Sequence, residues 1–423
     1  MSDSDYFECL RCAFELYHPG ESYLPTPVVL KLNHHHDLLW VCYSLVSTKL
    51  RTLKIQLPNN ASHFWRGEHI ATATNISTLS IRAPLLNELR LDGELHGILT
   101  SASVSGLEHL RCFQSDQSIE DEVLQSLASL PRLVKLEFVL SNEFLSVPPG
   151  SSSSPSLFPS LQSLQITASR LPPLAHFMQC YIHSGPAPIQ DLRIVIDWRK
   201  IKGCHTAPEN PLIGLDIVLA AGRLEQHLTS LIIFTDVDPP WPRLSAHPVL
   251  SFRDITPLFQ CARLQFFTIN AGYSLAGFRN SALEEMAAAW PQLRALQLVS
   301  YPQTKPMPCT ILCLRHFARC CPDLDFISLS FSPTPCGKIR RAGPGAINSS
   351  MESLAVGCSP LEISDVPVVA PFLARLFPNL LFMDYSSRHR NGLEEELKKY
   401  GSAWSAVTEL LRERRKRASP NQH

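Results

Sequence analysis

Histidines and cysteines are the residues of this 423-residue chain that could bind metals or act as nucleophiles. Three adjacent histidines stand in NHHHD (33–37), and CLRC (9–12) has the two-cysteine spacing of redox and zinc motifs. A metal site also needs further ligands at a suitable spacing, and neither segment has a second histidine group or cysteine pair in that position. We therefore predict a polar surface tract at 33–37, and no metal or cofactor.

The other cysteines lie mostly in apolar runs, such as FARCCPDL and MPCTILCLRHF, and bring the total to 13. A free thiol in such surroundings behaves as a small hydrophobic group. Cys309 and Cys313 would share one face of a helix, with Cys320 and Cys321 at its end, and core packing is the favoured interpretation. An odd cysteine count without a disulfide framework predicts a reducing compartment, the cytoplasm or the nucleus.

The sequence shows none of the common motifs of catalysis. AGPGA (342–346) is not followed by the Lys-Ser/Thr of a phosphate-binding loop, and the signatures of serine hydrolases, zinc proteases and kinases are missing. Basic and acidic residues balance at 38 each, which disfavours a nucleic-acid partner. The N-terminus lacks a secretory signal, and no apolar run is long enough to span a membrane. We predict a non-enzyme; an enzyme with an unrecognised site is the open alternative.

A recurring phrase accounts for the apolar residues better than any catalytic motif does. WPQLRALQLV begins at Trp290, and the same order of proline and spaced apolar residues begins at Leu130, Phe158 and Cys321. The phrase recurs at intervals of about 26–39 residues, in or near the range of leucine-rich repeats. The central apolar residues are Leu53, Leu79, Leu89, Leu110, Leu136, Leu164, Leu192, Leu231, Phe267, Leu296, Ile327, Leu354 and Met383, and one of Leu79 and Leu89 is expected to lie outside a repeat strand.

Alternation within each phrase predicts short strands that must stack. Leu136 and Phe138 would share one side of a strand, while Lys135 and Glu137 would face solvent. A single such strand cannot bury its apolar side, whereas stacked parallel strands form a continuous core. We therefore predict an α/β leucine-rich repeat solenoid, a horseshoe with parallel strands on the concave face and helices on the convex face.

The segments between the strands complete this organisation. Helices are predicted at 118–130, 280–290, 310–321 and 365–377, and the last is expected to kink or break at Pro371. Projecting loops are predicted at 146–156, 199–211, 236–248 and 332–350. The predicted domains are an N-terminal segment at 1–49 (a cap or a remnant) and a repeat domain at 50–390.

The C-terminus is predicted to close the solenoid. Apolar residues step by three or four positions through Leu393, Leu397, Tyr400, Trp404, Val407 and Leu411. We predict a capping helix at 391–412, with a free partner-binding helix as the alternative, and a basic disordered tail at 413–423. RERRKR (412–417) is either a solvated helix end or a short nuclear-import patch.

The order of these phrases resembles that of a known family. SALEEMAAAWPQLRALQL, LRHFARCCPDLDFISLSF and LAVGCSPLEISDVPVVAPFLARLFPNL follow one another as in the leucine-rich region of the large F-box protein family of mushroom-forming fungi. The resemblance covers roughly residues 50–412. It implies a substrate-recognition arm of a Skp–cullin–F-box ubiquitin ligase, with a Skp-type adaptor and a cullin complex as partners.

The family's F-box is not recognisable in this chain. An F-box normally opens with Leu-Pro-x-Glu, and the nearest trace, YLPTPVVLKL (23–32), lacks the acidic residue and a helical stripe. The alternative function is therefore a stand-alone leucine-rich repeat interaction protein with no link to ubiquitination.

Outward-facing strand positions predict where a protein partner binds. Early repeats place polar pairs such as Lys135 and Glu137 there, whereas later repeats place apolar and aromatic residues there. Exposed apolar residues on one face are typical of interaction surfaces. The predicted partner-binding residues are Ile232, Phe234, Phe266, Val299 and Phe326, with Asp191 and Arg193 on a polar rim. The alternative is that a nearby loop covers these side chains.

Overall fold

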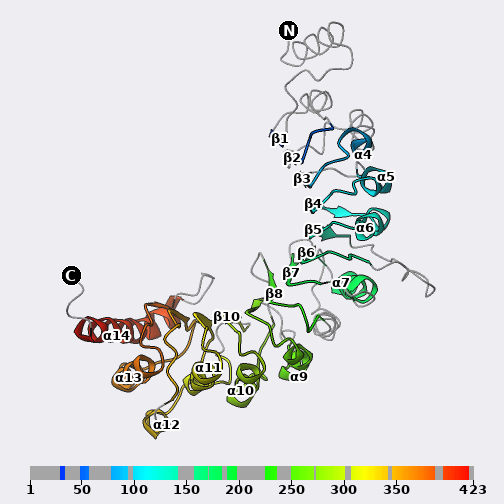
Figure 1. Cartoon of the computed structure of the whole chain (residues 1–423). Helices are drawn as coiled ribbons and strands as arrows, with labels where there is room; N and C mark the ends of the chain where they lie inside the picture. The colour runs from blue at the N-terminus through cyan, green and yellow to red at the C-terminus, as the bar shows by residue number, and fades with distance from the viewer. Residues whose placement is uncertain are drawn as a thin grey trace. The chain divides into compact units, whose positions relative to one another are not determined.

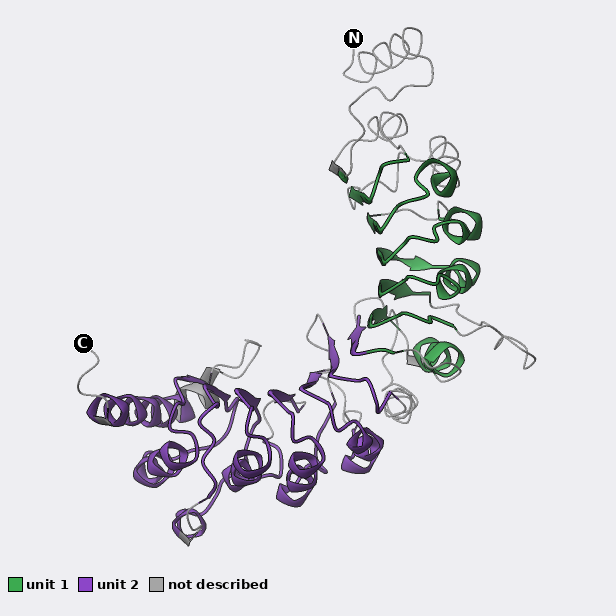
Figure 2. Cartoon of the chain, viewed as in Figure 1, with its two compact units in different colours: residues 1–189 green, residues 190–423 purple. Residues whose placement is uncertain are grey.

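A computed structural model gives the structure of the protein for thirteen stretches of the chain. The described residues are 29–33, 48–56, 78–93, 99–141, 157–169, 171–182, 188–197, 224–235, 249–270, 273–300, 306–341, 345–385 and 394–418. CLRC, the histidines of NHHHD and the predicted loops at 146–156, 199–211 and 236–248 therefore lie outside the described residues. The chain forms two compact units, Met1–Ile189 and Gln190–His423, which Figure 2 colours separately.

Unit 1 is a parallel sheet with its strands in chain order and helices between them (Figure 1). Its strands are β1 (Val29–Asn33), β2 (Thr52–Gln56), β3 (Glu88–Asp92), β4 (Cys112–Ile119), β5 (Lys135–Leu140) and β6 (Ser163–Ala168). Its described helices are α4 (Leu79–Arg82), α5 (Ser101–Ser105), α6 (Asp121–Ala128) and α7 (Leu171–Phe177), the last continued by a π-helical turn, η2 (Met178–Ile182).

Unit 2 repeats this arrangement with longer helices. Its strands are β7 (Asp191–Ile196), β8 (Ser230–Thr235), β9 (Phe266–Asn270), β10 (Ala295–Leu298), β11 (Phe326–Ser328), β12 (Ser353–Ala355) and β13 (Phe382–Asp384), parallel and in chain order. Its described α-helices are α9 (Phe252–Ile255), α10 (Asn280–Ala289), α11 (Leu314–Cys320), α12 (Cys336–Arg341), α13 (Val366–Leu376) and α14 (Glu394–Ala418). Short 3₁₀ turns precede or follow three of them: η4 (Thr256–Gln260), η5 (Ile311–Cys313) and η6 (Ile363–Asp365).

The register of the strands confirms the predicted fold class, an α/β leucine-rich repeat solenoid. In unit 2, one continuous line of paired residues runs through Leu192, Leu231, Phe267, Leu296, Ile327, Leu354 and Met383. In unit 1 the line runs through Leu53, Leu89, Phe113, Leu136 and Leu164. All of these except Met383 are buried. Stacking therefore forms the core that a single strand could not.

Within each unit the same backbone contact joins neighbouring repeats, from β2 to β6 in unit 1 and from β7 to β13 in unit 2. The carbonyl of the residue before a strand accepts two N–H groups from the start of the following strand. Gln265 O accepts from Arg294 N (2.8 Å) and Ala295 N (2.9 Å), and Arg294 O accepts from Asp325 N (2.9 Å) and Phe326 N (3.1 Å). The same pair of bonds recurs in unit 1, and it sets the register one repeat at a time.

One of the predicted strand centres is wrong, and one expectation about them is confirmed. Of Leu79 and Leu89, one was expected to lie outside a repeat strand, and Leu79 lies in the helix α4 while Leu89 lies in β3. Leu110 lies in the turn before β4, where its N–H donates to Leu107 O, and Phe113 is the residue aligned with Leu89 and Leu136. The phrase LEHLRCF (107–113) fits the repeat pattern in two registers, one centred on Leu110 and the other on Phe113. The hydrogen bonds between strands select Phe113.

Several element boundaries also differ from the prediction. Strand β1 lies within the predicted N-terminal segment at 1–49 and pairs with β2, so the sheet extends into that segment. Ser118 and Ile119 end β4, and α6 starts only at Asp121. Helix α13 runs unbroken through Pro371, and part of the predicted loop at 332–350 forms α12. Helix α14 continues to Ala418, so residues 413–418 are helical rather than a disordered tail.

None of the described helices combines the length and apolar character that a membrane span requires.

Leu296→Ala is expected to destabilise the protein by about 2–5 kcal/mol, because it leaves a cavity in the centre of the core. Leu296 is fully buried and lies between Phe267 and Ile327 in the register. Chemical denaturation of the purified variant measures the loss, with Gln297→Ala, on the opposite side of the same strand, as the control. A melting temperature within a degree of wild type for Leu296→Ala would contradict the assigned register.

Candidate functional site

The exposed sheet face of unit 1 is polar, and its side chains pair with one another. Glu137 in β5 accepts one hydrogen bond from Gln114 Nε2 in β4 and another from Gln165 Nε2 in β6, both at 2.8 Å. Lys135 Nζ lies 3.6 Å from the same carboxylate. This ladder of amides and charges is already satisfied within the chain, so it offers few unmet groups to a partner.

The exposed sheet face of unit 2 carries aromatic rings instead. The register aligns Asp191, Ser230, Phe266, Ala295, Phe326, Ser353 and Phe382 in one row across the strands. From β9 to β13 phenylalanines alternate with small residues, and we call these three rings, Phe266, Phe326 and Phe382, the phenylalanine row. Phe382 is 65% exposed and Phe266 39% exposed, while Phe326 is half-buried. With strands about 4.8 Å apart, the rings stand roughly 9–10 Å from one another.

The predicted partner-binding residues all lie on this face of unit 2, in two groups. The first is on β7 and β8, where Arg193 is paired with Ile232 and its guanidinium lies 5.9 Å from the centre of the Phe234 ring. The second is on β9 to β11, where Phe266 and Phe326 flank Ala295. Asp191 and Arg193 are exposed, and Ile232, Phe234 and Val299 are half-buried. That these residues bind a partner stays a prediction.

Phe382 belongs to the same row but was not among the predicted residues. The sequence did contain the signal for this residue, because alternation around the strand centre Met383 places Phe382 on the exposed side. The most exposed ring of the row was therefore predictable from the same rule that found Phe266 and Phe326.

A polar groove runs beside the phenylalanine row at the start of the strands. It is lined by Gln265, Gln292, Arg294, Asp323, Asp325, Ser350 and Glu352. Burial raises the pKa of Asp325, Arg294 opposes this shift, and repulsion from Glu352 adds to it. The guanidinium of Arg294 lies 4.0 Å from the Asp325 carboxylate, a long contact between half-exposed groups. The described lining of the groove holds three carboxylates and one cation, so its net charge favours a basic side chain from a partner.

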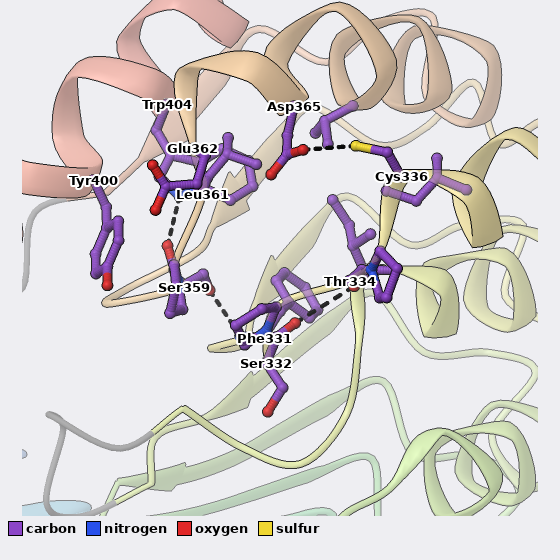
Figure 3. A pocket seen from close by; sticks show the side chains of 16 residues that line it. Phe331, Ser332, Thr334, Cys336, Ser359, Leu361, Glu362, Asp365, Tyr400 and Trp404 are labelled. Atoms are coloured by element: carbon purple, nitrogen blue, oxygen red, sulfur yellow. Dashed lines mark hydrogen bonds between the residues drawn. The ribbon is translucent and has the colours of Figure 1, made fainter.

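A cavity of about 370 Å³ lies elsewhere in unit 2, at the opposite ends of the strands (Figure 3). Its walls come from the loops after β11 and β12 and from helices α12, α13 and α14. Figure 3 shows Tyr400 and Trp404 of α14 on one side and Cys336 of α12 on the other. The floor is apolar and consists of the buried side chains of Ile311, Phe331, Ile339, Leu361 and Val369.

Hydrogen bonds within the chain hold this cavity in shape. The Trp404 indole donates to Ser359 O at 2.9 Å, and Ser359 Oγ accepts from Phe331 N at 2.7 Å. On the other wall, Ser332 Oγ donates to Met307 O at 2.7 Å, and Thr334 Oγ1 donates to Ser332 O at 3.4 Å. The hydroxyl and indole groups are thus already used to position the walls.

Cys336 is the one sulfur group among the described lining residues, and it is poorly suited to be a nucleophile. Its thiol donates to Asp365 Oδ1 at 2.7 Å. This hydrogen bond, together with desolvation and the charge of the carboxylate, raises the pKa of Cys336 above the ordinary value for a thiol. At neutral pH the group is therefore a protonated donor, whereas nucleophilic catalysis needs the thiolate.

Three of the four cysteines predicted to pack in the core around 309–321 are buried. Cys309, Cys313 and Cys321 have no exposed surface, and burial raises the pKa of Cys321 to about 12. Cys320 at the end of α11 is half-buried. Within the described stretches, no group of three or more His, Cys, Asp or Glu side chains is placed to hold a metal ion.

Comparisons with known proteins add little to this description. No protein-family model and no curated protein matches the chain. Among solved structures, the chain is similar to one chain of "Crystal structure of Rad7 and Elc1 complex in yeast", with 13% identity and a TM-score of 0.39. The match covers 94% of this chain and 86% of that chain. The fold class above rests on the sheet and its register, not on this likeness.

Proposed function

We propose that the protein is a non-catalytic binding scaffold, and that the exposed sheet face of unit 2 receives a protein partner. The observation that carries the proposal is the phenylalanine row, whose rings stand exposed on a regular backbone. A few aromatic anchors commonly provide most of the binding energy of a protein interface. The acidic groove beside the row favours a partner segment in which basic side chains neighbour apolar ones.

A more specific role is the substrate-recognition arm of a Skp–cullin–F-box ubiquitin ligase. It is supported by the family resemblance of the repeated helix, Trp-Pro or Cys-Pro, and strand. Such an arm holds its target while other subunits perform the chemistry, so it requires no catalytic residue here. In this proposal the protein works in the cytoplasm, with nuclear import through residues 412–417 as the alternative.

A stand-alone interaction protein is the second candidate, and β1 favours it. The nearest trace of an F-box, at residues 23–32, overlaps β1, which is paired in parallel with β2. A strand in the sheet cannot also be part of a helical docking module. This observation concerns the adaptor only and leaves the partner-binding face unchanged.

Affinity purification from cells distinguishes these two roles. The full chain and a Phe266→Ser/Phe326→Ser variant are captured in parallel, and co-purifying proteins are identified by mass spectrometry. Recovery of a Skp-type adaptor and a cullin with the full chain supports the ubiquitin-ligase role. Recovery of other partners without them supports the stand-alone role.

The Phe266→Ser/Phe326→Ser variant is expected to lose the partner recovered with the wild-type chain while keeping its melting temperature. Two anchor residues typically account for a loss of at least about tenfold in affinity. Binding is measured with purified components by calorimetry. The matched control is Lys135→Ser, at the corresponding strand position on the polar face of unit 1, which is expected to bind as wild type. Wild-type affinity in the folded double variant would place the interface elsewhere.

A further inference from the structure

The cavity between α12, α13 and α14 has a chemistry that partner binding at the sheet face does not use. Its volume of about 370 Å³ falls within the range of pockets that hold small organic ligands, roughly 300–1,000 Å³. Because the described hydroxyl and indole groups already pair within the chain, they contribute little to selecting a ligand. The cavity therefore offers a ligand mainly apolar surface, aromatic rings and carboxylates.

Among the described residues of the lining, two are carboxylates and none is Lys, Arg or His. Glu362 is exposed at the mouth, while Asp365 is half-buried and has one oxygen engaged by Cys336. The described basic residues of α12, Lys338 and Arg340, are exposed and outside the lining. Both charged side chains of the described lining are therefore acidic, and Glu362 would give a positively charged group a partner.

Aromatic rings supply the second component of cation recognition. Tyr400 and Trp404 project from successive turns of α14, and Figure 3 shows them on the side of the cavity where Glu362 also lies. The faces of Tyr and Trp rings attract cations, and carboxylates beside them add a charge-assisted contact. The apolar floor below would bury the uncharged body of the same ligand.

We propose that this cavity binds an organic cation with an apolar body, such as an amine or guanidine carried on an aromatic or branched aliphatic group. Its charged head lies at Glu362 and Asp365, and its body lies against Phe331, Leu361 and Val369. The site is distinct from the phenylalanine row, and it stands whether or not that face binds a protein.

Calorimetric titration of the full chain with three compounds of one shape tests the proposal. The compounds are 4-phenylbutylamine (cation), 4-phenylbutan-1-ol (neutral) and 4-phenylbutyrate (anion). The amine is expected to bind at least about tenfold more tightly than the alcohol, because a charged hydrogen bond is lost with the alcohol, and the anion is not expected to bind. Equal binding of all three compounds, or no binding of the amine at millimolar concentration, overturns the proposal.

Variants locate the bound cation. Glu362→Gln and Asp365→Asn keep the shape of the side chains and are each expected to weaken amine binding by about tenfold. The matched control is Glu409→Gln, an exposed carboxylate on α14 that pairs with Arg412 outside the cavity, and it is expected to bind as wild type. Thr334→Phe fills the cavity without removing a core group and is expected to abolish binding. Full amine binding in Glu362→Gln and Asp365→Asn, or in a folded Thr334→Phe, contradicts this location.

Discussion

Trp290→Ala is expected to lower the free energy of unfolding by about 3–5 kcal/mol, the typical cost of removing a large aromatic side chain from a core. Trp290 is fully buried, and its ring centre lies 4.8 Å from that of Phe267 and 5.6 Å from that of Phe259. Its indole N–H donates to Leu258 O at 3.0 Å. The substitution therefore removes packing in two neighbouring repeats and leaves a buried carbonyl without its donor.

A graded series separates these two contributions. Trp290→Phe restores part of the packing but not the hydrogen bond, so its loss should fall between those of wild type and Trp290→Ala. Glu285→Ala, at an exposed position of α10, is the control and should change stability by less than about 0.5 kcal/mol. Denaturant unfolding at equilibrium measures all three. A loss below about 1 kcal/mol for Trp290→Ala would show that this ring does not bridge the repeats as described.

Trp404→Ala should be the second most damaging substitution, and its effect should include self-association. Helix α14 covers the end of unit 2 with Ala403, Trp404 and Val407, all buried, and the Trp404 indole bonds to Ser359 O. Removing the ring costs about 3–5 kcal/mol by the same reasoning and exposes the apolar end of the repeats. Light scattering and thermal melting should therefore show aggregation beginning well below the wild-type transition.

Two truncations provide the controls for this prediction. Removing residues 413–423 leaves every buried residue of α14 in place, and this chain should remain monodisperse and as stable as wild type. Removing residues 391–423 deletes the helix and should cause aggregation. A stable, monodisperse chain after the longer truncation would favour the alternative, a free partner-binding helix, over a cap.

The core was predictable because burial and alternation act together at every strand. Leu192, Leu231 and Leu296 occupy the positions that the repeated phrase predicted, since only the register found in the structure buries all of them. Leu110 was misplaced because LEHLRCF allows two registers, and hydrogen bonding to the neighbouring strand decides between them. Such a choice depends on residues far away in the sequence.

The helix ends were less predictable, since local preferences compete there with packing. Pro371 favours a break, yet α13 continues past it because Val369, Phe372 and Leu373 are buried on both sides of the proline. The basic run at 413–417 predicted a tail from its charge, whereas α14 extends through it with ion pairs such as Arg417–Glu413.

The two candidate sites also differ in how far the sequence could predict them. The phenylalanine row follows from a local rule, alternation within each strand, and so Phe266 and Phe326 were found from the sequence. The cavity combines Thr334, Glu362 and Tyr400 from three separate segments, and no pattern along the chain connects them. A site of this kind can be recognised only once the fold brings its walls together.

The double hydrogen bond at the start of each strand has a consequence for how such a chain can change during evolution. Because Gln265 O and Arg294 O set the register where the next strand begins, and the strands pair onward from there, the segment between the end of a strand and the following turn can lengthen or shorten without moving the register. Duplication or deletion of a whole repeat would also preserve the bonding scheme. Neutral drift in repeat number and loop length is therefore tolerated, while a shift of a single residue at Trp290-Pro291 would put the polar residues of β10 into the core.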